Sequence, residues 1–161
     1  MWQDAGFLTG KADTKFAMKK LAHCIETMPE AFKALTDQEL LQFPAPGKWS
    51  RKQILGHLID SAINNLKRFT DIQFLPGPYI VQSYLQNELV AVNNYQQLPL
   101  DHLLQLWQTL NRQIIFVVEN IPAEKFHYPV NPQYNNKEMK TLGWLICDYV
   151  AHMEHHQKQL F

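Results

Sequence analysis

The sequence predicts an all-α fold, a four-helix bundle in which longer crossover connections join some of the helices. Four segments of about twenty residues place apolar side chains mostly three to five positions apart, a spacing that lines one face of a helix. No stretch alternates apolar and polar residues for long enough to indicate a sheet. Two connections, at about 75–100 and 121–140, are longer than a helical hairpin needs, so the helices need not alternate up and down.

The first helix is expected at about 13–35. Pro29 lies inside it and should kink or break it, because proline lacks an N–H and clashes with the preceding turn. A capping-box pattern, Thr36 to Glu39, then opens a short helical turn that ends at the loop 44–47. The apolar positions of the first helix are Phe16, Leu21, Cys24, Ile25, Met28, Phe32 and Leu35.

The second helix is expected at about 51–73, because Ser50 and Gln53 form another capping box. Residues 79–97 fit an irregular helix or a structured crossover. The apolar positions of the second helix are Leu55, Leu58, Ile59, Ala62, Leu66 and Phe69.

The third helix is expected at about 101–120, with Asp101 as its cap. Polar residues and prolines between 122 and 140 indicate a loop. The fourth helix is expected at about 141–160, with Thr141 as its N-cap.

Length and composition favour one globular domain spanning residues 1–161, in which 1–11 are expected to be poorly ordered. The formal net charge is zero, which argues against a nucleic-acid-binding protein. No apolar run approaches the roughly 20 residues that span a bilayer, and the N-terminus lacks a signal-peptide pattern, so no membrane association is expected. Cys24 and Cys147 are interpreted as free thiols in a reducing compartment, which favours the cytoplasm.

The histidines of the last helix are the main functional signal. His152 and His156 are four residues apart, about 40° around a helix, and two imidazoles so placed can hold one divalent metal. His155 points further outward. His57, in the second helix, could supply a third ligand, but it lies outside the apolar stripe. Spacing alone leaves open whether it belongs to a solvated face or to a polar seam beside a pocket.

Other polar side chains near these histidines have two interpretations each. Asp148 and Asp60 could accept the second N–H of a ligand imidazole, or could be solvated acids. Arg68 could hold a substrate carboxylate, or could be an exposed arginine that follows Asn64 along the polar side of the helix. Trp144 could line the same groove as His152, or pack against the core.

Two segments resemble the signatures of the DinB-like superfamily, which includes YfiT-like proteins. The first is Pro46–Ser50 followed by Ile54–Ser61, and the second is Tyr149–Gln159, with its H-x-x-x-H helix. Residues 106–111 and 120–122 also look like the family's third helix and its exit, so the resemblance covers nearly the whole chain. It implies a four-helix bundle and, by residue match, one divalent metal ion on His57, His152 and His156, zinc or otherwise nickel.

The superfamily includes transferases and isomerases that use low-molecular-weight thiols. The resemblance and the histidine spacing therefore predict a metal-dependent transferase that joins such a thiol to a small electrophile, with no protein general base identified. A hydrolase using metal-activated water is the alternative enzyme. A bundle that binds a small ligand without catalysis, or a structural partner protein without metal, are the non-enzymatic alternatives. A homodimer is compatible with the pattern but not required by it.

Overall fold

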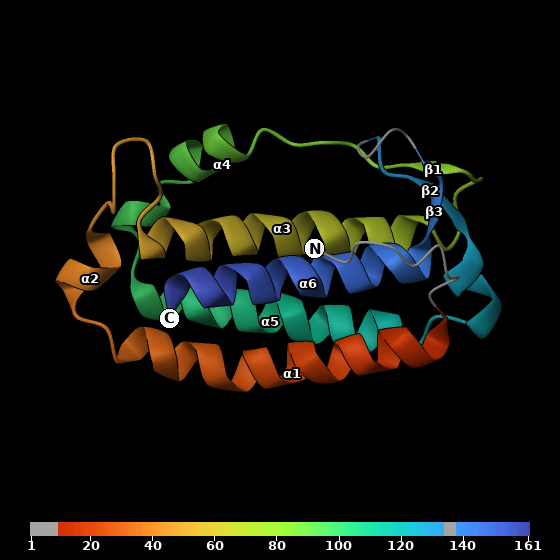
Figure 1. The fold of residues 1–161 in the computed structure, drawn as a ribbon, viewed down its shortest axis with the longest axis horizontal. Helices are drawn as coiled ribbons and strands as arrows, with labels where there is room; N and C mark the ends of the chain where they lie inside the picture. Colours follow the sequence, from red (N-terminus) through yellow and green to blue (C-terminus); the bar gives the residue numbers. More distant parts are fainter. Residues whose placement is uncertain (1–9, 134–137) are drawn as a thin grey trace.

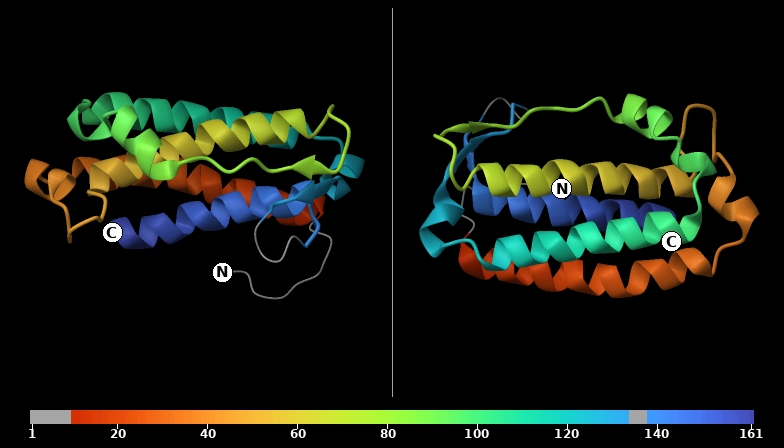
Figure 2. Two further views of the ribbon diagram at one scale, coloured as in Figure 1. Left: turned by 90° about the horizontal axis from the view of Figure 1, so that it is seen from above. Right: turned by 180° about the vertical axis from the view of Figure 1, so that it is seen from behind.

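The computed structural model describes residues 10–133 and 138–161. The expectation of poor order for residues 1–11 falls mostly on residues 1–9, which lie outside these ranges. Four long helices form the bundle (Figures 1 and 2). Their bounds are α1 Lys11–Lys33, α3 Arg51–Asp71, α5 Leu100–Glu119 and α6 Leu142–Leu160. Both α1 and α3 pack against α5 and against α6, and the prediction of an all-α four-helix bundle is confirmed.

The direction of the helices explains the long connection in the middle of the chain. In Figure 1, α3 and α5 run in the same direction, opposite to α1 and α6. The chain must therefore return along the length of the bundle between α3 and α5. It does so through β1 (Tyr79–Ile80), α4 (Gln86–Val92) and the 3-10 turn η1 (Tyr95–Gln97). The structured crossover expected at 79–97 is present and covers one side of α3 (Figure 2).

The connection between α5 and α6 stays at one end of the bundle. It contains the 3-10 turn η2 (Ala123–His127), β2 (Pro129–Asn131) and β3 (Lys140–Thr141). Strand β2 pairs in parallel with β1 and antiparallel with β3. The expectation of no sheet was wrong for this small element, because strands of two or three residues are too short to show a period of two.

Local capping signals were mostly reliable. At the start of α3, the Ser50 side chain accepts a hydrogen bond from the backbone N–H of Gln53. At the start of α2 (Asp37–Leu41), the Thr36 side chain accepts a hydrogen bond from the backbone N–H of Glu39. Thr141 accepts from the Trp144 N–H at the start of α6, as predicted. The expected cap at Asp101 was wrong. Helix α5 starts at Leu100 with Pro99 as its N-cap, and Asp101 lies in the first turn, where its charge favours the helix dipole.

The expected break at Pro29 does not occur, since α1 continues from Lys11 to Lys33. Proline leaves the carbonyl of Ile25 without its usual main-chain donor. The side-chain amide of Gln108, from α5, donates to that oxygen at 3.0 Å. A tertiary contact thus replaces the missing helical hydrogen bond.

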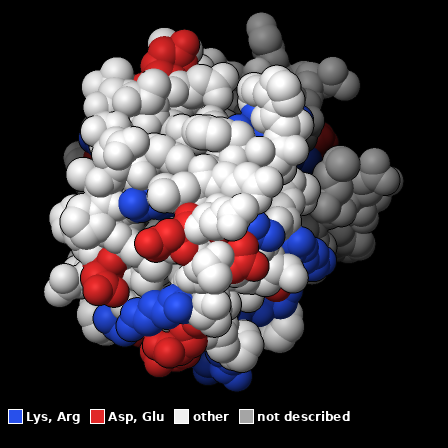
Figure 3. All heavy atoms as spheres, turned by 90° about the vertical axis from the view of Figure 1, so that its left-hand side faces the viewer, with Lys and Arg blue, Asp and Glu red and all other residues white. Residues whose placement is uncertain are grey.

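Charges of both signs are interspersed on the end of the bundle that carries α2 (Figure 3). This mixture agrees with the zero net charge and gives that face no extended region of a single sign. Within the described residues, none of the helices combines the length and the hydropathy needed to cross a bilayer.

Candidate metal centre

Three histidines from two helices meet near the α2 end of the bundle. His57 is on α3, and His152 and His156 are one turn apart on the antiparallel α6. The Nε2 atom of His152 lies 3.3 Å from Nε2 of His57 and 3.1 Å from Nε2 of His156. One ligand nitrogen from each histidine lies within 4.8 Å of the other two. The structure therefore brings the three predicted ligands together.

The nitrogen separations fit a common ion. Two nitrogens bound to one zinc ion at 2.0–2.1 Å, at a tetrahedral angle, would lie about 3.3 Å apart. The two measured separations are close to this value. A hydrogen bond between neutral imidazoles accounts for one of the two contacts of His152 Nε2 but not for both, because this nitrogen has either one proton to donate or one lone pair to accept with.

Burial keeps these histidines in the form that binds metals. It lowers the pKa of His57 to about 4, with a smaller effect from His156. It lowers the pKa of His152 to about 3, with smaller effects from His156 and His57. The pKa of His156 is also lowered by burial, against an opposing hydrogen bond from Gln159. Near neutral pH all three imidazoles are neutral, as metal ligation requires.

Gln159 fixes the tautomer of His156, a role that the sequence interpretation missed. Its side-chain oxygen lies 2.9 Å from Nδ1 of His156, and its amide nitrogen lies 3.0 Å from Nε2 of the exposed His155. An amide oxygen only accepts, so Nδ1 of His156 carries the proton and Nε2 keeps its lone pair for a metal. The signal was available, because Gln159 is three residues after His156 and so lies on the same face of the helix.

Of the two interpretations that spacing left open for His57, the solvated face is wrong. His57 is only 1% exposed, although it lies outside the apolar stripe of α3. The Trp49 ring packs on it with centroids 4.9 Å apart. The crossover covers the neighbouring positions, where the Tyr95 ring lies against Gly56. The polar side of α3 is thus buried by a segment distant in sequence.

Asp60 is 3% exposed and lies one turn after His57. Its Oδ1 accepts from the Tyr95 hydroxyl at 2.6 Å and from the Asn93 amide at 3.1 Å. Burial raises the pKa of Asp60, while these two hydrogen bonds lower it. Within the described residues, Oδ2 of Asp60 and Nδ1 of His57 are both buried without a hydrogen-bond partner. One is an acceptor and the other can carry a proton, so they are chemically complementary.

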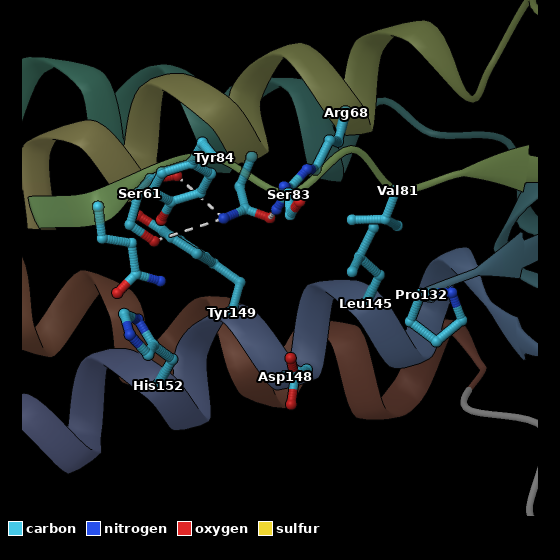
Figure 4. A pocket seen from close by; sticks show the side chains of 12 residues that line it. Ser61, Arg68, Val81, Ser83, Tyr84, Pro132, Leu145, Asp148, Tyr149 and His152 are labelled. Atoms are coloured by element: carbon cyan, nitrogen blue, oxygen red, sulfur yellow. Dashed lines mark hydrogen bonds between the residues drawn. The ribbon is translucent and has the colours of Figure 1, made fainter. Parts of the chain in front are cut away.

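A cavity of about 310 Å³ extends from His152 between α3 and α6, under the crossover (Figure 4). Among the candidate residues, Arg68 and Asp148 line it, whereas Asn64 and Trp144 are not among its described lining residues. Asn64 donates to the Asp60 carbonyl, and Trp144 packs against the core. The complete lining is Ser61, Asn65, Arg68, Val81, Ser83, Tyr84, Gln86, Pro132, Leu145, Asp148, Tyr149 and His152.

Both cysteines are free thiols, as expected. Burial raises the pKa of Cys24, and it raises the pKa of Cys147 to about 11. A thiol with so high a pKa is almost entirely protonated near neutral pH and is a poor nucleophile.

Comparison with known proteins assigns the chain to a family. The family model described as the DinB superfamily matches residues 20–160. A Halalkalibacterium halodurans protein named "Putative metal-dependent hydrolase" is 26% identical over 136 residues, which cover 82% of this chain and 77% of that protein. The structure of YfiT from Bacillus subtilis, described as having an unusual four-helix bundle topology, is similar with a TM-score of 0.83 and 21% identity, covering 96% of this chain and 87% of YfiT.

A mycothiol-dependent maleylpyruvate isomerase is a more distant structural neighbour. Its TM-score is 0.63 at 14% identity, covering 88% of this chain and 60% of the isomerase. The family match extends from within α1 to the end of α6 and includes all three histidines. The chain belongs to the DinB superfamily.

Proposed function

We propose that this protein binds one divalent metal ion through His57, His152 and His156, and is a metal-dependent enzyme acting on a small molecule. The convergence of the three Nε2 atoms, with separations of 3.3 and 3.1 Å, carries the proposal. Zinc is the first choice because neutral imidazoles in a tetrahedral arrangement suit it, and nickel is the second. Three protein ligands leave a coordination position for a substrate, as in catalytic rather than structural zinc sites.

The reaction we propose joins a low-molecular-weight thiol to a small electrophile: the sulfur forms a bond to the electrophilic carbon, the S–H proton passes to solvent, and the leaving group of the electrophile departs with the electron pair of the bond that breaks. When bound, a divalent metal favours the thiolate over the thiol by stabilising its negative charge. The protein's own thiols are held protonated by burial, so the nucleophile would come from outside the chain. The structural neighbour that depends on mycothiol supports this choice of co-substrate.

Other residues of the protein would orient the histidine ligands and provide space for the substrate. Gln159 holds His156 in the tautomer that presents Nε2, and Trp49 restricts rotation of the His57 ring. We propose that Asp60 is a positioning residue, which accepts the Nδ1 proton of His57 when the imidazole is ligated. The cavity beside His152 offers room for a small substrate next to the three ligands.

A hydrolase is the second candidate. The relatives named metal-dependent hydrolases favour it, and the same metal would activate water in place of a thiol. The two reactions differ in one requirement: a transferase forms product only when a thiol is present, and a hydrolase forms product without it.

The first experiment is to measure the metal content of tag-free protein purified without a nickel column. About one zinc or nickel ion per chain is expected, with loss of the ion in His152→Ala and retention in His155→Ala, an exposed neighbour on the same helix. A metal-free protein whose melting temperature does not respond to added zinc would contradict the proposed metal site. Retained metal with no thiol-dependent product from a panel of electrophiles would contradict the transferase.

A further inference from the structure

The cavity beside the histidines has a charged group well away from them. Arg68, on α3, lines the same cavity as His152, and its side chain extends toward Ser83 and the Tyr84 ring, whereas Val81, Leu145 and Pro132 lie at the end of the cavity away from His152 (Figure 4). The hydroxyl-bearing side chains Ser61, Tyr84 and Tyr149 lie nearer His152. The cavity therefore offers a polar region, one cationic group and an apolar end.

The Arg68 guanidinium has donors to spare. It donates through Nη2 to the Gln82 carbonyl and through Nη1 to Oδ1 of Asn65, the latter at 3.4 Å. It also lies over the Tyr84 ring, 5.7 Å from the centroid. A guanidinium carries five N–H groups, so these two bonds leave others for a ligand.

The positive charge of Arg68 has no carboxylate partner among the described residues. The ion pairs within this part of the chain are formed by lysines: Lys20–Glu154, Lys33–Glu30, Lys67–Asp71 and Lys140–Glu138. Asp148 lines the cavity from α6, the wall opposite Arg68 (Figure 4). The positive charge of Arg68 therefore attracts an anionic ligand group to the α3 wall of the cavity.

The helix geometry gives the length of such a ligand. The hydrogen bond from Arg68 to Asn65 places the guanidinium near Asn65 along the axis of α3. Asn65 is eight residues after His57. At 1.5 Å per residue this is about 12 Å along α3. Allowing for the bonds at each end, about 7 Å remains, so a ligand that reaches both sites would separate its anionic group from its reacting atom by roughly five to six covalent bonds.

We propose that Arg68 binds a carboxylate of a small-molecule ligand whose reacting group lies at His57, His152 and His156. The planar guanidinium matches a carboxylate through paired N–H donors. The inference rests on the proposed function for the position of the reacting group, but the carboxylate site itself does not need the metal. The carboxylate belongs either to the thiol or to the electrophile.

The test measures binding by calorimetry with unbranched probes of increasing length. The probes are alkanoates, the matching ω-mercaptocarboxylates from mercaptopropionate to mercaptooctanoate, and the neutral amides of both. Each is titrated into metal-free and zinc-loaded protein. The variants are Arg68→Met, Arg68→Lys and, as a matched control, Arg112→Met, which removes an exposed arginine of α5.

Alkanoates are expected to bind metal-free protein and to bind roughly 10–100-fold more weakly to Arg68→Met. Arg112→Met should bind as wild type, and Arg68→Lys should fall between, since it keeps the charge but loses the paired donors. Amides should bind wild type and Arg68→Met equally. Carboxylates and amides that bind alike, or equal losses in Arg68→Met and Arg112→Met, would overturn the proposal.

The titrations of zinc-loaded protein test the Arg68 site separately from the proposed metal-dependent function. They also show whether the carboxylate belongs to the thiol or to the electrophile. Zinc-dependent thiol binding that ignores the carboxylate would leave the proposed function standing and overturn the Arg68 site. Alkanoate binding that depends on Arg68, together with mercaptocarboxylate binding that does not improve with zinc, would leave the Arg68 site standing and contradict the proposed function. A thiol source predicts that mercaptocarboxylates bind best at one chain length. An electrophile source predicts that alkanoates bind equally well when mercaptoethanol saturates the zinc.

Discussion

The Tyr95 ring lies directly against Gly56, the residue before the metal-ligand candidate His57. A Cβ atom at position 56 would overlap Cδ2 of the Tyr95 ring. Tyr95 in turn donates to Asp60, one turn further along α3. The absence of a side chain at Gly56 thus allows the crossover to cover the part of α3 that carries His57.

Gly56→Ala is therefore expected to destabilise the metal-free protein by about 1–3 kcal/mol, because the Tyr95 ring must move. This would occur although alanine is the better helix former. Urea unfolding of the metal-free protein measures the loss, with Gly10→Ala as the control, since nothing lies within 4 Å of a Cβ there. Equal stability of Gly56→Ala and wild type would show that Tyr95 does not depend on this contact.

Asp60→Asn distinguishes an effect of Asp60 on zinc binding, through the orientation of His57, from an effect on the stability of the protein. The asparagine side-chain oxygen can still accept from Tyr95, and the substitution removes a buried carboxylate whose pKa is raised by burial. The stability of the metal-free protein should therefore change by less than about 1 kcal/mol, while zinc affinity should fall roughly 10–100-fold. Competition with a chromophoric chelator measures the affinity. Unchanged affinity would remove Asp60 from the site.

Gln159→Leu tests the second positioning contact. Without the Gln159 oxygen, the His156 imidazole loses the acceptor that fixes its tautomer. Zinc affinity is expected to fall about tenfold, with little change in the stability of the metal-free protein, because Gln159 is exposed. Lys158→Leu, an exposed substitution one position earlier, serves as the control and should bind zinc as wild type does.

Sequence-based prediction succeeded for relations between residues that are close together in the chain. The turn-to-turn relation of His152 and His156 and the capping of α3 by Ser50 and of α6 by Thr141 depend on residues at most four positions apart. Helix geometry alone fixes such relations. The resemblance to the DinB-like superfamily supplied His57, whose own spacing did not identify it as a ligand.

The burial of His57 and Asp60 could not be predicted from the helix pattern. An apolar stripe predicts burial on one face, but α3 contacts α5, α6 and the crossover together. Tyr95 and Asn93, more than 30 positions along the chain, cover the polar side of α3 and donate hydrogen bonds to Asp60. The apolar periodicity of α3 does not indicate which distant segment supplies the hydrogen-bond partners of Asp60.

The stability of the metal-free protein should depend on pH through the buried histidines. An unfolded histidine takes up a proton below about pH 6.5. In the folded protein the pKa of His57 is about 4 and that of His152 about 3. Between these values the unfolded chain binds more protons, so this stability is complete above pH 6.5 and is lost as the pH falls toward 4 and then 3.

From pH 7 to pH 5, the free energy of unfolding should fall on the order of 2–4 kcal/mol more in wild type than in a His57→Gln/His152→Gln variant. Denaturant unfolding in the presence of a chelator measures the difference at each pH. His155→Gln, which changes an exposed histidine, should follow wild type. Parallel pH profiles for wild type and the double variant would mean that the two imidazoles are as accessible to protons as in the unfolded chain.

The continuity of α1 through Pro29 depends on Gln108. Its amide donates to the Ile25 carbonyl, which proline deprives of a main-chain donor. Gln108→Leu should therefore destabilise the protein by about 1–3 kcal/mol, because a carbonyl in the α1–α5 interface loses its partner. Gln105→Leu, at an exposed position of the same helix, should have a small effect.

A double-mutant cycle with Pro29→Ala distinguishes this explanation from loss of packing. Alanine at 29 restores an N–H that can bond to the Ile25 carbonyl, so Gln108→Leu should cost less in that background. The difference between the two costs gives the coupling energy of Pro29 and Gln108, expected to be about 1 kcal/mol or more. An identical cost in both backgrounds would mean that Gln108 stabilises the helix pair by contact alone. The uninterrupted course of α1 would then be due to the surrounding core rather than to a replacement hydrogen bond.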